Sequence, residues 1–112
     1  MPVKLQITPA VALVAAVLVF LCALPATVTA DAKSDFESRC TACHGFGIAG
    51  APKLGDIEAW KARIDKGMDV LYDSAINGIN SATGSMPARG GFTALSDEQL
   101  IAIVDYMVEN SR

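Results

Sequence analysis

The chain has 112 residues, which is enough for one small domain. Its formal net charge of −3 argues against a nucleic-acid-binding protein, because such proteins neutralise phosphates with an excess of Lys and Arg. The sequence also lacks the cluster of basic residues that binds anionic lipid surfaces.

Residues 1–30 have the layout of a secretory signal peptide, with a basic residue near the start, an apolar run over 10–24 and small residues before Ala30. The run is shorter than the roughly 20 apolar residues of a membrane-spanning helix, so we expect cleavage after Ala30 and a periplasmic location. An uncleaved N-terminal anchor is the alternative. Cys22 lies in this run and would be removed with it. The expected mature domain is therefore 31–112.

The expected mature domain holds all the acidic residues and all but one of the basic residues, so its formal charge is −4. A domain of this size buries a modest core and often needs a covalent staple or a cofactor for stability. Once Cys22 is removed, only Cys40 and Cys43 remain as cysteines that can provide one.

Short helices separated by glycines are predicted along the mature domain. The first spans about 32–41 and the second 56–67, and a third at 69–77 ends before Gly78. No alternation of apolar and polar residues is long enough to indicate a sheet. The segment 80–94 is rich in turn-forming residues and is predicted to be a loop.

The last helix has the clearest sequence signal. Ser96 and Gln99 match a capping box, and Leu95 and Leu100 match a hydrophobic staple across the helix start. One apolar stripe follows, made of Leu100, Ile103, Val104, Met107 and Val108. We expect this stripe to pack against Phe36 in the first helix.

The stretch CTACHG, residues 40–45, brings two thiols and the only histidine of the chain together. A structural zinc site needs four ligands, and this stretch offers only Cys40, Cys43 and His44. A thioredoxin-like redox pair needs a βαβ setting, and no strand pattern is present. A plain disulfide is a third alternative. The Cys-x-x-Cys-His pattern is typical of covalent attachment of a c-type haem, and we favour that interpretation.

In this interpretation, the two thiols add to two haem vinyl groups, because one helical turn presents both sulfurs to one edge of the porphyrin. His44 then lies under the iron as the proximal ligand. A single histidine limits the chain to one haem and leaves the sixth position to another residue type. Met68 and Met107 lie in or beside helices and are expected to fill the core. Met86 lies in the loop before Pro87, which keeps its backbone extended, and it is the candidate sixth ligand.

Further segments extend the pattern beyond the haem motif CTACHG. They are GAPKLGD, Trp60, MDVLYDSAINGIN, MPARGG and LSDEQLIAIVDYM, and with CTACHG they occur in this order over nearly all of residues 35–107. With these segments the chain resembles the class I c-type cytochromes, and more closely the small bacterial branch called cytochrome c-5. The resemblance implies an all-α class I cytochrome c fold, with four to five short helices wrapped around one covalently attached haem c.

The resemblance also implies roles for single residues. The carbonyl of Pro52 would accept a hydrogen bond from the second ring nitrogen of His44, which would fix the orientation of the ring. Met86 would be the axial methionine. Phe36 and Tyr106 would form the aromatic contact between the first and last helices.

Two further residues and two departures from the family pattern concern the surface around the haem. Trp60 and Arg89 are candidates for a position near the haem propionates, with ordinary packing and a solvated loop charge as the alternatives. The branch often carries an extra Cys pair where this chain has Phe92 and Leu95, so an apolar contact is expected there instead. The segment 80–85 is longer than usual and is expected to change the surface at the haem edge.

The sequence thus predicts a periplasmic monohaem electron carrier rather than an enzyme, since binding of His44 to iron leaves no pair of nucleophile and base. Redox proteins are the expected partners, as transient donors and acceptors, and the acidic surface favours partners with a basic docking patch. Nucleic acid is not an expected partner, and a membrane is expected only through redox complexes or an uncleaved anchor. Two alternatives stay open: a haem subunit of a larger dehydrogenase or oxidase complex, and a haem ligand sensor with an open iron site.

Overall fold

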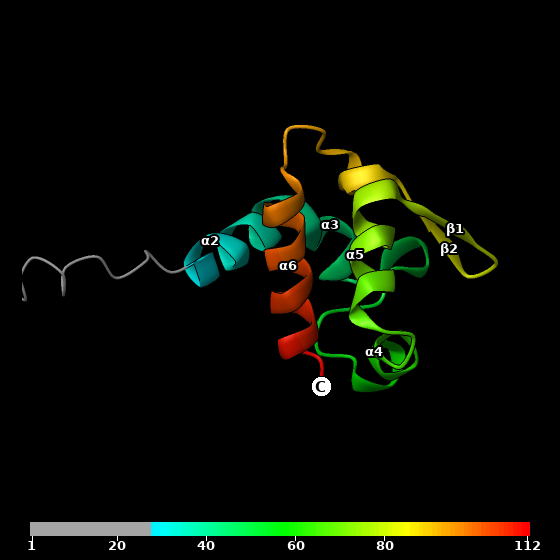
Figure 1. Cartoon of the computed structure of the whole chain (residues 1–112). Coiled ribbons are helices and arrows are strands. Elements are labelled where there is room, and N and C mark those ends of the chain that lie inside the picture. Colours follow the sequence, from blue (N-terminus) through cyan, green and yellow to red (C-terminus); the bar gives the residue numbers. More distant parts are fainter. Residues whose placement is uncertain (1–27) are drawn as a thin grey trace, which may run out of the picture.

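The computed structural model describes residues 28–112, which form short helices and one small β-hairpin (Figure 1). The expected signal peptide over 1–30 lies outside the described residues except for its last three positions, and Cys22 lies outside them as well. Within the described part of the chain, no helix combines the length and the hydropathy that a bilayer crossing requires.

The first helical segment is longer than predicted, and it continues without a break as far as His44. It consists of α2 (Val28–Asp35), one wider π-helical turn (Phe36–Cys40) and α3 (Thr41–His44). Thr41 explains the wider turn, because both its backbone N–H and its hydroxyl donate to the carbonyl of Phe36, five residues earlier. The turn ends at Cys40, so the second thiol and the imidazole follow directly on α3.

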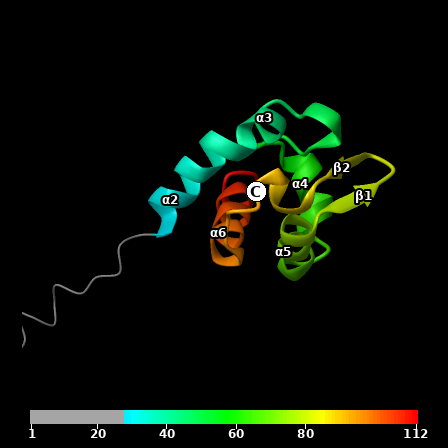
Figure 2. The same cartoon turned by 90° about the horizontal axis from the view of Figure 1, so that it is seen from above.

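Three more helices complete the frame: α4 (Ile57–Ile64), α5 (Met68–Asn77) and α6 (Asp97–Glu109). Asp56 caps α4 by accepting the Ala59 N–H at 3.1 Å, and the predicted capping box of Ser96 and Gln99 begins α6. In both views α6 runs between α2 and α5 and contacts each of them (Figures 1 and 2). This arrangement makes α6 the centre of the helical frame.

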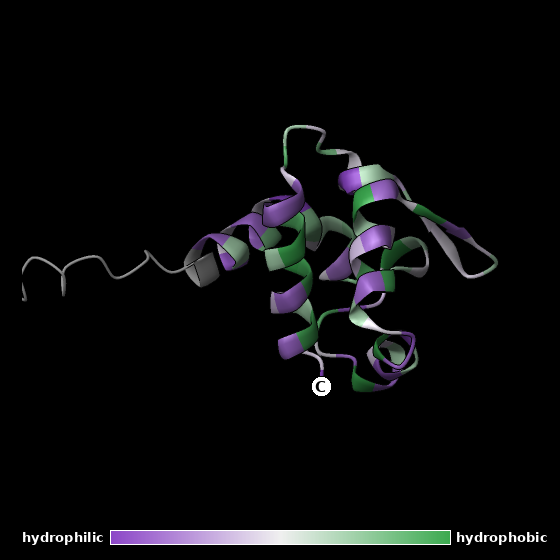
Figure 3. Ribbon diagram, viewed as in Figure 1, coloured by the Kyte–Doolittle hydropathy of each residue, from purple (hydrophilic) through white to green (hydrophobic). Residues whose placement is uncertain are grey.

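The core lies along α6, where the predicted apolar stripe is buried. Its members are 2–8% exposed: Leu100, Ile103, Val104, Met107 and Val108. Phe36 joins this core, and its ring centroid lies 5.6 Å from that of Tyr106, which confirms the expected aromatic contact. In Figure 3, hydrophobic residues (green) and hydrophilic residues (purple) alternate along the turns of α6. The helical frame therefore follows from the periodicity of the sequence.

The prediction of a plain loop over 80–94 is wrong at its start. The segment Ile79–Ser81 (β1) pairs with Gly84–Met86 (β2) as an antiparallel hairpin, with Ile79 opposite Met86 and Ser81 opposite Gly84. Strands of three residues are too short to show a period of two, so the sequence contains no detectable sheet signal. The longer segment expected at the haem edge is this hairpin, which protrudes from the helical frame (Figure 1).

Of the two residues expected to make an apolar contact in place of the extra Cys pair, only one has a buried side chain. Leu95 is 4% exposed and belongs to the core, whereas Phe92 is 41% exposed. The N–H of Leu95 donates to the carbonyl of Phe92 at 3.0 Å. The two residues are thus joined by a backbone turn, and only one of their side chains is buried.

Candidate functional site

The start of the site is the end of the first helical segment, which brings two thiols and an imidazole together. The thiols of Cys40 and Cys43 are both free, with Cys40 half-buried and Cys43 exposed. Burial, with a smaller contribution from the Asp35 carboxylate, raises the pKa of Cys40 to about 11. A thiol that stays protonated at neutral pH is a poor redox nucleophile, which argues against Cys40 as the attacking thiol of a redox pair.

His44 is held through both its backbone and its ring. Its Nδ1 lies 2.9 Å from the carbonyl oxygen of Pro52, and its own carbonyl accepts the Leu54 N–H at 2.7 Å. A carbonyl can only accept, so Nδ1 donates and Nε2 keeps its lone pair. Burial lowers the pKa of His44 below its ordinary value and the nearby Arg63 adds to this, while the bond to Pro52 acts in the opposite direction. The neutral ring therefore has an unprotonated Nε2, the form in which an imidazole could bind a metal ion.

The three methionines in the described part of the chain have different environments. Met107 is 5% exposed within the stripe of α6, and Met68 is the first residue of α5 and packs against the core. Met86 is the last residue of β2 and is half-buried, and it also packs against the core. Of the three, only Met86 lies outside the helices, at the end of a strand from which its thioether could reach a bound group.

The segments next to His44 and Met86 expose apolar side chains that a small helical protein usually covers. Phe46 and Ile48 follow His44 and are 71% and 54% exposed, and Ile79, the hairpin partner of Met86, is 45% exposed. Two free thiols, a neutral imidazole, a thioether and this apolar surface fit a large apolar macrocycle with a central metal ion. That is the chemistry of a haem.

The structure gives protein partners to both residues considered for the propionates. Trp60 is 4% exposed, and its indole N–H donates to the carbonyl of Lys53 at 2.9 Å. Arg89 donates to the carbonyl of Leu95 at 2.6 Å and forms an ion pair with Asp97. The indole has a single donor and it is already used, so packing describes Trp60. The guanidinium of Arg89 has further donors, so its place near the propionates stays a prediction.

Ser111 supports the site, and sequence reasoning missed it. It follows α6 and is 1% exposed, and its hydroxyl accepts the N–H of Gly55 at 2.9 Å. The bond ties the end of α6 to the loop that contains Pro52, the partner of His44. A single serine after a helix has no recognisable signal in a sequence, so only the fold reveals this contact.

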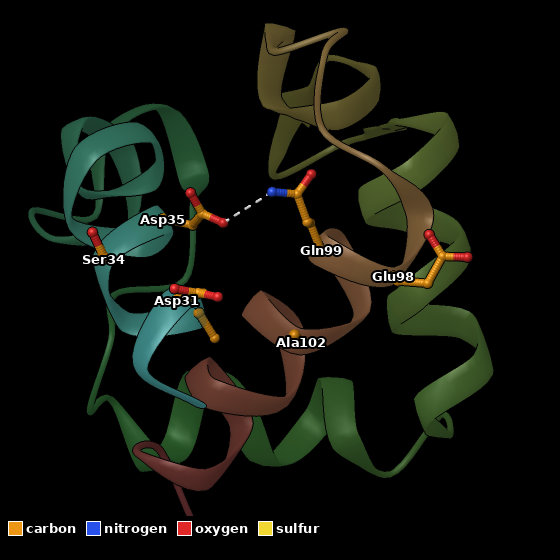
Figure 4. A pocket seen from close by; sticks show the side chains of 7 residues that line it. Asp31, Ser34, Asp35, Glu98, Gln99 and Ala102 are labelled. Carbon is orange, nitrogen blue, oxygen red and sulfur yellow. Dashed lines mark hydrogen bonds between the residues drawn. The ribbon is translucent and has the colours of Figure 1, made fainter. Parts of the chain in front are cut away.

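A cavity of about 340 Å³ lies elsewhere, between α2 and α6 (Figure 4). It is lined by Asp31, Ala32, Ser34, Asp35, Glu98, Gln99 and Ala102. The amide of Gln99 reaches across it to the carboxylate of Asp35 at 3.4 Å (Figure 4). None of the predicted site residues lines this cavity, so it is separate from the candidate site.

Comparison with known proteins finds similar sequences over most of the chain. A family model described as "Cytochrome C oxidase, cbb3-type, subunit III" matches residues 27–107. Cytochrome c-555 of Chlorobaculum tepidum is 42% identical over 83 residues, which cover 74% of this chain and 77% of that protein. Cytochrome c5 of Ectopseudomonas mendocina is 44% identical over 71 residues, which cover 62% of this chain and 77% of that protein.

Two solved structures have a similar fold. One is a chain in the crystal structure of an electron transfer complex of nitrite reductase with cytochrome c; it has a TM-score of 0.65 and 38% identity, and the match covers 73% of this chain and 95% of that chain. The other is a mono-heme ferrocytochrome c from Shewanella putrefaciens, with a TM-score of 0.59, 35% identity and the same two coverages.

Proposed function

Since the chain belongs to the small class I c-type cytochromes, we propose that it is a periplasmic one-electron carrier whose iron is bound by His44 and Met86. It holds one covalently attached haem c, as its relatives do. The observation that carries the ligation is the 2.9 Å contact between His44 Nδ1 and the Pro52 carbonyl, because it orients the ring and leaves Nε2 available to iron.

The remaining site residues have separate tasks in this proposal. Cys40 and Cys43 would hold the porphyrin through two thioether bonds on one edge. When bound, the haem supplies a reversible one-electron change at its iron. Met86 would provide a soft neutral sixth ligand, which raises the reduction potential and closes the site to small molecules. A closed site suits electron transfer rather than catalysis or gas sensing.

The proposed location rests on residues 1–30, which we expect to be removed during export. The proposed partners are redox proteins that bind transiently, with basic surfaces that complement the formal charge of −4 of the mature domain. A similar cytochrome c has been solved in an electron transfer complex with nitrite reductase, which supports partners of this kind.

A haem subunit of a larger oxidase is the second candidate. The description of the family model favours it, and so does the cbb3-type cytochrome c oxidase subunit FixP of Bradyrhizobium diazoefficiens, which is 31% identical over 90 residues. The identity to the cytochromes c-555 and c5 is higher, at 42% and 44%, and it favours the separate carrier.

Intact mass and a visible spectrum of the purified protein test the proposal together. We expect the mass of residues 31–112 plus one haem, which remains with the chain in acid–organic extraction. Release of the haem in that extraction would contradict attachment through Cys40 and Cys43. An intact Met1 in a membrane fraction would favour the uncleaved anchor, and co-purified oxidase subunits would favour the second candidate.

A further inference from the structure

The β-hairpin over 79–86 lies directly against the segment that follows His44, as both views show (Figures 1 and 2). The contact is made by backbone on backbone. A Cβ on Gly50 would lie 1.7 Å from the carbonyl oxygen of Thr83, and a Cβ on Gly84 would lie 2.4 Å from the carbonyl oxygen of Ala49. Only glycine fits at these two positions, because any side chain would push the hairpin away.

At the base of the hairpin, too, the backbone packs too closely on a glycine to leave room for a side chain. A Cβ on Gly78 would lie 2.8 Å from both the N atom of Ala88 and the carbonyl oxygen of Met86. Beyond Met86, the guanidinium of Arg89 donates to the carbonyl of Leu95 at 2.6 Å, which ties this segment to the start of α6. The backbone around Met86 is thus held at the hairpin tip, at its base and after its end.

We propose that the hairpin braces Met86 against the segment that carries His44, with Gly50 and Gly84 as positioning residues for the sixth ligand. This inference rests on the proposed function, because it takes Met86 as that ligand. A thioether on an unsupported loop would lose conformational entropy each time it bound the iron. A hairpin already docked on the opposite segment removes part of that cost, as preorganised binding groups do.

The test compares carbon monoxide binding by the reduced, haem-loaded protein in five forms. Gly50→Ala and Gly84→Ala disturb the contact. Gly67→Ala is the matched control for Gly50→Ala, because Gly67 also has a positive φ, +104°, but has no atom within 4 Å of the added Cβ. Ser85→Ala is the control for Gly84→Ala, since Ser85 is exposed on the same strand and its hydroxyl bonds only within the hairpin, to Asn80 and the carbonyl of Ile79. Wild type is the fifth form.

Carbon monoxide competes with Met86, so its apparent affinity rises in proportion to the fraction of molecules with the thioether dissociated. We expect Gly50→Ala and Gly84→Ala to bind carbon monoxide at least about tenfold more tightly than wild type, with a lower reduction potential. Both controls should stay within about twofold of wild type. If Gly50→Ala and Gly84→Ala excluded carbon monoxide as fully as wild type does, the proposal that the hairpin positions Met86 would be refuted.

Failure of the proposed function would look different. Wild type would then bind carbon monoxide as readily as Met86→Ala does, whatever the glycine variants do. A second measurement covers glycine variants that do not fold. Coupling is reciprocal, so Met86→Ala should speed amide hydrogen exchange in 47–50 as well as in the hairpin. Unchanged exchange in 47–50 would mean that the two segments are not coupled and would refute the inference.

Discussion

The helical frame differs from the two segments beside it, which are residues 45–50 after His44 and the hairpin 79–86 that ends at Met86. These two segments are called the second region below. Along α6, five apolar side chains are 2–8% exposed, whereas Phe46, Ile48 and Ile79 are 45–71% exposed. Regular periodicity lets α6 bury its apolar stripe, but the segments next to His44 and Met86 leave apolar surface that the haem would cover. In this account the haem is part of the fold of the second region, and not a ligand added to a finished domain.

Removal of the covalent haem should have the largest effect. In the double variant Cys40→Ala, Cys43→Ala, the helices of 4–13 residues would have to fold around an incomplete core. Isolated helices of this length are marginal in water, and the domain is small. We expect circular dichroism to show a largely unfolded chain. A compact apo domain with a cooperative unfolding transition would mean that the frame folds without the second region.

The next effect concerns the second region alone. Met86→Ala should open the sixth position, so that the reduced protein binds carbon monoxide while the helical frame stays folded. The reduction potential should fall, because the soft neutral thioether that favours ferrous iron is lost. Met68→Leu is the control. If that control lost the six-coordinate spectrum and Met86→Ala kept it, the choice of methionine would be wrong.

The contact that joins the two regions should matter less. Ser111→Ala removes the buried hydroxyl that accepts the N–H of Gly55, which should cost about 0.5–1.5 kcal/mol of unfolding free energy in urea titrations of the haem-loaded protein. Ser74→Ala is the control, since Ser74 on α5 makes an exposed hydrogen bond to the carbonyl of Val70, and it should change stability by less than about 0.5 kcal/mol. Equal effects would show that Ser111 does not link the regions.

A conservative change inside the frame should be milder. Met107→Leu keeps the volume of the stripe on α6 nearly constant, so the loss of unfolding free energy should stay under about 1.5 kcal/mol. The visible spectrum should not change, because Met107 is a core residue in this account. A shifted spectrum would place Met107 at the iron and remove the distinction between the frame and the site.

The smallest effect is a pH dependence within the frame. The hydroxyl of Tyr72 on α5 donates to the carboxylate of Asp105 on α6 at 2.6 Å, and this bond raises the pKa of Tyr72 to about 12 from an ordinary value of 10.0. The folded state favours the neutral phenol. The stability that this hydrogen bond adds to the folded state is therefore fully present below pH 10 and is lost as the pH rises to about 12. The stability difference between wild type and Tyr72→Phe should shrink over that range. A constant difference would refute this assignment.

The same contrast explains which features could be predicted. The capping box at Ser96 and Gln99, the stripe on α6 and the pair Phe36–Tyr106 follow from helical spacing and from the family resemblance. The hydrogen bond between His44 and Pro52 was also expected and is present at 2.9 Å. These features depend on local spacing or on a motif, which a sequence displays directly.

The contacts of the second region could not be predicted, because they join segments far apart in the sequence. A sequence shows that Gly50 and Gly84 are glycines, but not that each faces the backbone of the other's segment. The hairpin has strands too short for a periodic signal, and nothing in the sequence marks the left-handed backbone of Arg89, with φ +56°.

Carbon monoxide titration of the reduced wild-type protein, followed by its visible spectrum, tests the central claim most directly. We predict a six-coordinate spectrum that carbon monoxide leaves unchanged, because in this account His44 and Met86 would both bind the iron. Ready binding of carbon monoxide by the wild type would contradict the account. The chain would then be a haem protein with an open site, and the ligand-sensor alternative would replace the electron carrier.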